Sequence, residues 1–149
     1  MSNYERYNEI KFSADRLLFQ FESSGPRGKI IKLVEFALIA PGVYNLAFGN
    51  RLDGDSIDDA AVSDNEDRDK ILATIAAIVD EFTNYYPAAR LYFTGSTNSR
   101  TRLYRMALTK AKTELLQRYI IMGLTDGKLE PFGSIKDYDG FVILRKENT

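Results

Sequence analysis

The residues best suited to chemistry lie together in one short segment, TGSTNSRTRLYRM at positions 94–106. Hydroxyl groups, guanidinium groups and a glycine that lets the backbone approach closely are groups that hold an anion. A helix start adds amide N–H groups without partners inside the helix and the positive end of the helix dipole. The segment therefore predicts an anion-binding site. Its candidate residues are Gly95, Ser96, Thr97, Ser99, Arg100, Arg102 and Arg105.

The charge pattern around this segment favours the same prediction. The net charge is −1, but residues 50–81 carry ten acids against three bases, whereas residues 82–113 carry six bases and no acid. A local patch of this kind acts over about one Debye length, roughly 8 Å at physiological salt, although the whole molecule is nearly neutral. We therefore expect a binding domain whose ligand is a phosphate group or a nucleic-acid backbone.

Two other interpretations of the same arginines remain open. In the first, Arg100 and Arg105 form salt bridges with the acidic loop at residues 53–69, and the chain is a structural domain or binds a protein partner. In the second, the basic cluster and Tyr104 belong to a histidine-free ribonuclease-like toxin, in which arginines stabilise the charge of the transition state. A non-enzymatic role is favoured, and the sequence assigns no catalytic residue.

The residue types that are missing exclude several chemistries. The chain has no cysteine and no histidine, which excludes disulfides, thiolate nucleophiles and the commonest ligands of transition metals. The acids Asp64, Asp67 and Asp69 fit a helix start better than a metal site, so we expect no metal and no cofactor. Neither a Walker-type GxxxxGK[ST] pattern nor a GxGxxG pattern occurs, so no nucleotide motif supports the anion site.

The elements that must position the segment follow from hydrophobic periodicity. A short strand at residues 89–95 precedes it, and a helix at residues 98–118 follows it. Another amphipathic helix is expected at residues 64–83, with Ser63 or Asp64 as its cap. Strands are expected at residues 9–13, 17–22, 29–39, 42–49, 60–62 and 141–146, with a turn at Pro41-Gly42 and a hairpin over residues 119–131 that turns at Asp126-Gly127.

This order of elements determines the expected fold class. A run of strands followed by helix, strand, helix and further strands is typical of an α+β domain. A chain of 149 residues fits one domain. We therefore expect a single domain over residues 1–149, with a mainly antiparallel sheet and two helices packed on one face.

Four segments of the chain are distinctive: YNLAFGN (44–50), SDNEDRDKILATIA (63–76), TGSTNSRTRLYRMALTK (94–110) and KDYDGFVILRK (136–146). Together they resemble a small bacterial family of single-domain proteins that is labelled only as a domain of unknown function. The resemblance runs from about Lys29 to Lys146 and does not include the first 28 residues. It implies a bacterial, cytoplasmic, stand-alone domain, and it implies no activity, cofactor or catalytic residue.

The termini and the apolar runs bear on location. The start, MSNYERYNEIKF, lacks the basic segment followed by an apolar one that marks a signal peptide. The longest strongly apolar run, residues 71–79, is far shorter than the ~20 residues that a membrane helix needs. We therefore expect a cytoplasmic protein that does not associate with a membrane.

Overall fold

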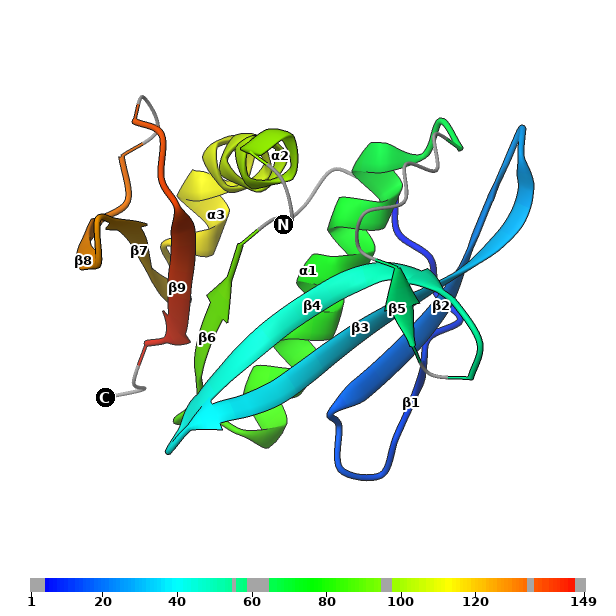
Figure 1. Cartoon of the computed structure of the whole chain (residues 1–149), viewed down its shortest axis with the longest axis horizontal. Helices are drawn as coiled ribbons and strands as arrows, with labels where there is room; N and C mark the ends of the chain where they lie inside the picture. The colour runs from blue at the N-terminus through cyan, green and yellow to red at the C-terminus, as the bar shows by residue number, and fades with distance from the viewer. Residues whose placement is uncertain (1–4, 55, 59–64, 95–97, 134–135, 147–149) are drawn as a thin grey trace.

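The computed structural model describes residues 5–54, 56–58, 65–94, 98–133 and 136–146. Within these residues the strands form one nine-stranded sheet of order β1-β2-β3-β4-β6-β9-β7-β8, and β5 pairs with β4 beside this path (Figure 1). The strands are β1 (Lys11–Phe12), β2 (Leu18–Gly25), β3 (Gly28–Ala40), β4 (Val43–Arg51), β5 (Ile57–Asp58), β6 (Arg90–Phe93), β7 (Tyr119–Thr125), β8 (Lys128–Pro131) and β9 (Gly140–Arg145). The helices are α1 (Arg68–Tyr85), α2 (Asn98–Lys110) and α3 (Lys112–Leu115).

Strand pairing in the described part of the chain is antiparallel except between β4 and β6. The predicted α+β class with a mainly antiparallel sheet is therefore confirmed.

Both predicted turns are also confirmed. Gly42 has φ +72° between β3 and β4, and Asp126 and Gly127 have φ +50° and +76° between β7 and β8. Two successive positive φ values are the geometry of the tight hairpin turn that an Asp-Gly pair favours.

The sheet divides between β4 and β6. These two strands run parallel and pair only over Val43–Asn45 with Arg90–Tyr92. Toward its carboxyl end, β4 pairs instead with β5, through Asn50 with Asp58 and Arg51 with Ile57. The first strands of the chain extend the sheet on one side of this point and the last strands extend it on the other. The short β4–β6 pair is therefore the place where the two parts of the sheet meet.

Aromatic side chains attach the helices to the inner face of the sheet. Phe82 of α1 is fully buried and stacks on Phe36 of β3, with ring centroids 3.9 Å apart and an angle of 9° between the rings. Tyr104 of α2 meets Phe93 of β6 edge to face, at 5.7 Å. Buried residues from both halves of the sheet belong to the same hydrophobic core.

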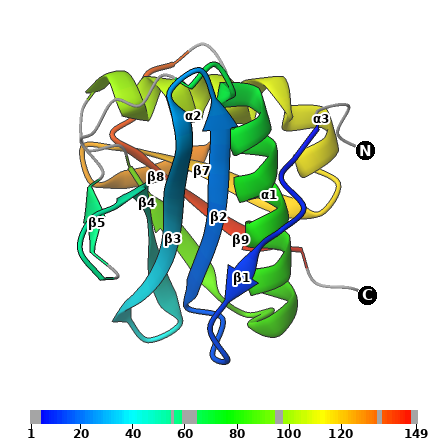
Figure 2. The same cartoon turned by 90° about the vertical axis from the view of Figure 1, so that its right-hand side faces the viewer.

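The segment before β1 lies along α1 (Figure 2). The Tyr7 amide donates to Oγ1 of Thr74 at 2.8 Å, and Nζ of Lys70 lies 4.3 Å from the centre of the Tyr7 ring. The Tyr7 hydroxyl donates to Oδ2 of Asp67 at 2.5 Å, and Ser23 donates to the same oxygen at 2.6 Å. Asp67 therefore ties the first residues of the chain and β2 to the start of α1.

This use of Asp67 corrects the predicted start of the helix. The α1 helix begins at Arg68 rather than at residue 64. The expected caps, Ser63 and Asp64, lie outside the described residues. Asp67 occupies the N-cap position, but its side chain makes no capping hydrogen bond. The Asp67 carboxylate, which the local sequence assigns to the helix start, instead accepts hydrogen bonds from Tyr7 and Ser23, which are far from it in sequence.

The helix count is also corrected. The helix expected at residues 98–118 is interrupted, so that α2 and α3 replace it and the described chain has three helices rather than two. The packing of two helices on one face is not confirmed, because a groove separates α1 from α2 and α3. The strand expected at residues 60–62 lies outside the described residues, and the short strand before α1 is β5. Of the described helices, none has the length and apolarity to cross a membrane.

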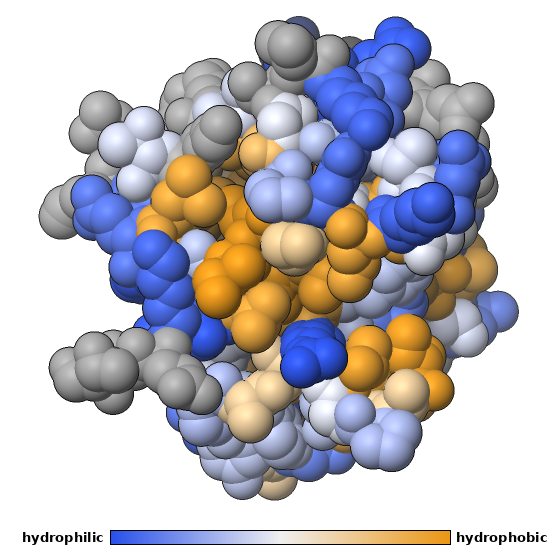
Figure 3. All heavy atoms as spheres, turned by 90° about the vertical axis from the view of Figure 1, so that its left-hand side faces the viewer, coloured by the Kyte–Doolittle hydropathy of each residue, from blue (hydrophilic) through white to orange (hydrophobic). Residues whose placement is uncertain are grey.

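The outer face of the sheet is apolar where β7, β8 and β9 lie, and hydrophobic side chains gather on that side of the molecule (Figure 3). Ile120 and Leu129 are 42% and 52% exposed there. Cross-strand register places Met122 opposite Val142, and Ile120 opposite Leu144. The inner residues of β7, Tyr119 and Ile121, alternate with these and are buried.

Candidate functional site

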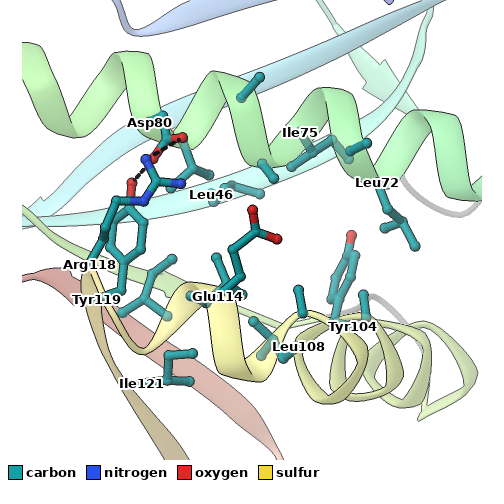
Figure 4. Close-up of a pocket in the computed structure, with 18 of the residues that line it drawn as sticks. Leu46, Leu72, Ile75, Asp80, Tyr104, Leu108, Glu114, Arg118, Tyr119 and Ile121 are labelled. Carbon is teal, nitrogen blue, oxygen red and sulfur yellow. Dashed lines mark hydrogen bonds and ion pairs between the residues drawn. The ribbon is translucent and has the colours of Figure 1, made fainter. Parts of the chain in front are cut away.

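A cavity of about 1160 Å³ lies between α1 on one side and α2 and α3 on the other (Figure 4). We call it the interhelical groove. Its floor is the inner face of the sheet, with Leu46 and Phe48 from β4, Phe93 from β6 and Ile121 from β7. The parting of β4 from β6 lies directly beneath it, because these strands contribute floor residues beyond their short paired region.

Small side chains on the facing helix walls explain why the groove is open. Ala73, Ala76 and Ala77 line it from α1, and Ala107 and Ala111 line it from α2 and the residue that follows. Residues three or four apart lie on one face of a helix. Each wall therefore presents an alanine face to the other wall, and neither face fills the space between them.

A polar network closes one end of the groove. The Tyr119 hydroxyl donates to Oδ1 of Asp80, and Nη1 of Arg118 lies 3.0 Å from Oδ2 of the same carboxylate. The Tyr119 hydroxyl also lies 3.0 Å from Oγ1 of Thr83, which accepts from Arg145 at 3.1 Å. These contacts join α1 to β7 and β9 across the groove floor.

The same network fixes the protonation of Tyr119. Its side chain is 2% exposed. Burial, and then the hydrogen bond to Asp80, raise the pKa of Tyr119 from 10.0 to about 12. At neutral pH Tyr119 is therefore a neutral donor to Asp80. It serves as a structural link at the end of the groove and does not act as a base there.

Two further polar side chains reach into the groove (Figure 4). Glu114 of α3 points its carboxylate across the cavity toward α1, in the direction of Ile75 and Leu46. The Tyr104 hydroxyl of α2 points toward Leu72. Four acids and two bases line the groove, so its formal charge is negative. The acids are Asp69, Asp80, Glu81 and Glu114, and the bases are Arg6 and Arg118.

The structure describes only part of the predicted anion site. Gly95, Ser96 and Thr97 lie outside the described residues, as do the side chains of Ser99 and Arg100. Arg102 is exposed on α2. The remaining candidate, Arg105, forms an ion pair in which its Nε lies 3.5 Å from Oδ1 of Asp137.

The ion pair between Arg105 and Asp137 bears on the alternative in which the arginines form salt bridges within the chain. Arg105 is engaged within the chain, as that alternative expects. However, Asp137 lies between β8 and β9 and not in the acidic loop at residues 53–69. Three acids of the acid-rich stretch at residues 50–81 line the groove, namely Asp69, Asp80 and Glu81.

Sequence reasoning did not identify the interhelical groove. Its residues come from β4, α1, β6, α2, α3, β7 and β9, which are brought together only by the tertiary fold. One local signal is present, namely the repeated alanines at helical spacing in residues 73–77 and 107–111. Alanine is also the best helix former, so this signal alone does not distinguish a groove from an ordinary helix.

Residues 3–146 match the model of one protein family, which is described only as a family of unknown function. The predicted resemblance to such a family is confirmed, and the match includes most of the first 28 residues, which the resemblance left out. No curated protein and no solved structure matches the chain.

Proposed function

The chain belongs to DUF6934, a family of unknown function, and we propose from its geometry that it is a binding domain that holds an elongated, largely apolar ligand in the interhelical groove. The observation that supports the proposal is the cavity of about 1160 Å³ at the point where the sheet divides. Ligand pockets are usually concave, lined mainly by apolar side chains, and supplied with a few polar groups that orient the ligand. The groove has each of these properties.

The state of the polar groups favours binding over catalysis. Asp80 is engaged by both Arg118 and Tyr119, and Tyr119 keeps its proton at neutral pH. Glu81 pairs with Arg16, whose Nε lies 3.7 Å from Oε1. Groups held in this way orient a ligand or shape the walls of its site.

Filling the groove should weaken binding. We expect the neutral fluorescent dye Nile red to brighten and shift to shorter wavelength when it is added to the wild-type protein. Ala107→Trp places an indole between the two helix walls and should weaken dye binding about tenfold or more, a loss of about 1.4 kcal/mol or more in binding free energy. Thr109→Trp is the matched control, since Thr109 lies two residues away and is exposed.

The dye affinities of Ala107→Trp and Thr109→Trp, compared with that of the wild type, test whether the dye binds in the groove. Circular dichroism and the thermal midpoint should show that both variants are folded. Equal dye binding by wild type, Ala107→Trp and Thr109→Trp would mean that the dye does not enter the groove. Absence of binding to the wild type would count against a preformed apolar site.

A second candidate function is anion binding at the start of α2, through Gly95, Ser96, Thr97, Ser99, Arg100, Arg102 and Arg105. The observation that favours it is the position of this segment. The α2 helix begins at Asn98, soon after β6, at the edge where the parallel strands β4 and β6 part. The start of a helix supplies free backbone N–H groups and the positive end of the helix dipole, and both favour a phosphate group. The ligand would be a phosphorylated small molecule or a nucleic-acid backbone.

Charge reversal tests the anion site. Arg102→Glu should weaken the binding of a short single-stranded oligonucleotide by roughly tenfold, and log K for the wild type should fall steeply with log salt. Fluorescence anisotropy at low salt measures both effects. Arg27→Glu is the control, because Arg27 is exposed in the turn between β2 and β3. If the oligonucleotide fails to bind, inorganic phosphate should still raise the thermal midpoint of the wild type. Without either effect the anion proposal is wrong.

A further inference from the structure

We propose that two copies of this chain associate through the outer face of β6, β9, β7 and β8, with the strands of one copy antiparallel to those of the other. This surface lies on the opposite side of the sheet from the interhelical groove, so the inference goes beyond the proposed function and does not depend on it. We call the surface the apolar sheet face. Its residues are Tyr92, Ile120, Met122, Leu124, Leu129, Pro131, Val142 and Leu144.

The register of the four strands assembles the apolar sheet face. Residues that stand directly opposite each other on antiparallel strands point to the same side of the sheet. The register forms three rows, which are Tyr92–Val142–Met122–Pro131, Leu144–Ile120 and Leu124–Leu129. Apolar side chains therefore lie next to one another both along the strands and across them.

A glycine makes room for Tyr92 on this face. A Cβ atom at Gly140 would lie 3.1 Å from Cε1 and 3.2 Å from the hydroxyl oxygen of Tyr92. The Tyr92 ring therefore lies against β9 at the position where a side chain of Gly140 would stand. Gly140 is opposite Leu124, so the ring continues the third row toward β6 and the three rows form one surface.

The apolar sheet face is far more exposed than the inner face of the same strands. Ile120 and Leu129 are 42% and 52% exposed, whereas Ile121, on the inner face of β7, is 3% exposed. Within the described part of the chain, α2 packs on the inner face, where Tyr104 meets Phe93. A contiguous exposed apolar surface with a polar rim is typical of a protein interaction site.

The two ends of the apolar sheet face carry charges of opposite sign. At one end Arg90 is opposite Leu144, and Lys146 follows two residues after Leu144, where its amide continues the pairing with the start of β7. At the other end Asp126 lies in the β7–β8 turn, and its amide donates to Oδ2 of Asp139 at 3.0 Å. All four charged residues are exposed.

This charge pattern is complementary to itself. Homodimers usually have a two-fold axis, so that the same surface of each copy meets itself. If the axis lies between the two faces and runs across the strands, the acidic end of each copy meets the basic end of the other. Lys128, near the acidic end, alternates with Leu129 and so lies on the other side of the sheet. Charge pairs at an exposed rim determine the orientation of the copies more than their affinity.

The size of the apolar sheet face indicates a weak dimer. Four strands about 4.8 Å apart and about 20 Å long cover roughly 300–400 Å². Stable interfaces bury about 800 Å² on each partner, and smaller ones belong to transient complexes. We therefore expect a dissociation constant on the order of tens of micromolar.

Sedimentation velocity over a range of protein concentrations measures the association. The average mass of the wild type should rise from that of one chain toward that of two. Leu129→Glu places a carboxylate in the apolar sheet face and should weaken association about tenfold or more, because the charge would be desolvated in the dimer. Leu52→Glu is the matched control. Leu52 is 53% exposed and lies after β4, away from this face, so the control should associate like the wild type.

A charge swap tests the antiparallel arrangement and the identity of the partner. Arg90→Glu and Asp126→Arg should each weaken association about threefold or more, because each places like charges at both ends of the interface. Combining both changes in one chain should restore association, since the introduced acid of one copy then meets the introduced base of the other. Circular dichroism and the thermal midpoint check the fold of Asp126→Arg, because position 126 has φ +50°.

Each result supports or overturns the inference. A wild type that remains monomeric up to about 1 mM overturns it, far above the expected dissociation constant. A dimer that persists in Leu129→Glu also overturns it, because the dimer would then use another surface. If the combined charge variant associates no better than the single variants, the antiparallel arrangement is wrong. Association that is lost in Leu129→Glu, kept in Leu52→Glu and restored by the charge swap supports the inference.

Discussion

Replacing Phe82 with alanine is expected to lower the free energy of unfolding by about 3–5 kcal/mol. Phe82 is fully buried, and its ring stacks on Phe36 at 3.9 Å between centroids. It also meets Tyr44 at 5.2 Å and Tyr86 at 5.0 Å. Removing the ring therefore loses its transfer free energy and leaves a cavity at the contact between α1 and the sheet. A domain of this size is stable by about 5–15 kcal/mol, so the expected loss is a large part of the total.

Urea unfolding of the wild type, Phe82→Ala and Phe12→Ala measures this difference. Phe12 is the control because it is 47% exposed, and its loss should cost about 1 kcal/mol or less. Similar midpoints for the two variants would contradict the assignment of Phe82 to the centre of the core. The prediction matters for the groove, because Phe82 holds in place the helix that forms one of its walls.

The α1 helix shows what periodicity predicts well. Its apolar residues recur at helical spacing, and four of those expected to face the core are buried: Ile71, Ile78, Val79 and Phe82. Leu72 and Ile75 belong to the same pattern, but they line the groove. Periodicity indicates which face of a helix is apolar. It does not indicate whether another helix packs against all of that face.

Long-range pairing accounts for the features that the sequence could not predict. β9 lies between β6 and β7, although β7 and β8 precede it in the chain. β4 pairs with β6 in parallel across an intervening helix. Local patterns predict each of these strands or its turn, but the choice of neighbour depends on contacts between residues far apart in sequence. The groove exists because of that choice, and this is why no local motif identified it.

The candidate site in the sequence and the groove in the structure share one feature, which is the uneven charge distribution. One interpretation of the sequence pairs Arg100 and Arg105 with the acidic loop at residues 53–69. In the structure Asp80 and Glu81, from the acid-rich stretch at residues 50–81, line the groove, and Arg118, which pairs with Asp80, comes from beyond the basic stretch at residues 82–113. Charge runs in the sequence indicate that like charges lie near one another along the chain, but the tertiary fold decides which surface they share.

The link between Tyr119 and Asp80 should make the stability of the protein fall steeply at alkaline pH. The pKa of Tyr119 is raised from 10.0 to about 12 in the folded state, first by burial and then by its hydrogen bond to Asp80. A raised pKa means that the folded state holds the proton more tightly than the unfolded state does. The stabilisation is therefore complete below pH 10.0 and is lost as the pH rises to about 12. Two pKa units correspond to about 2–3 kcal/mol.

Tyr119→Phe isolates this effect from the other groups that titrate in the same range. At neutral pH the variant should be less stable by about 1–2 kcal/mol, because Asp80 and Thr83 lose a buried hydrogen-bond partner. The advantage of the wild type over the variant should shrink and then vanish or reverse as the pH rises to about 12, since the wild type alone loses the stabilisation that the proton of Tyr119 provides. Urea unfolding at a series of pH values measures it. A difference that stays constant over the alkaline range would show that folding does not raise the pKa of Tyr119 and would contradict its burial and its hydrogen bond to Asp80.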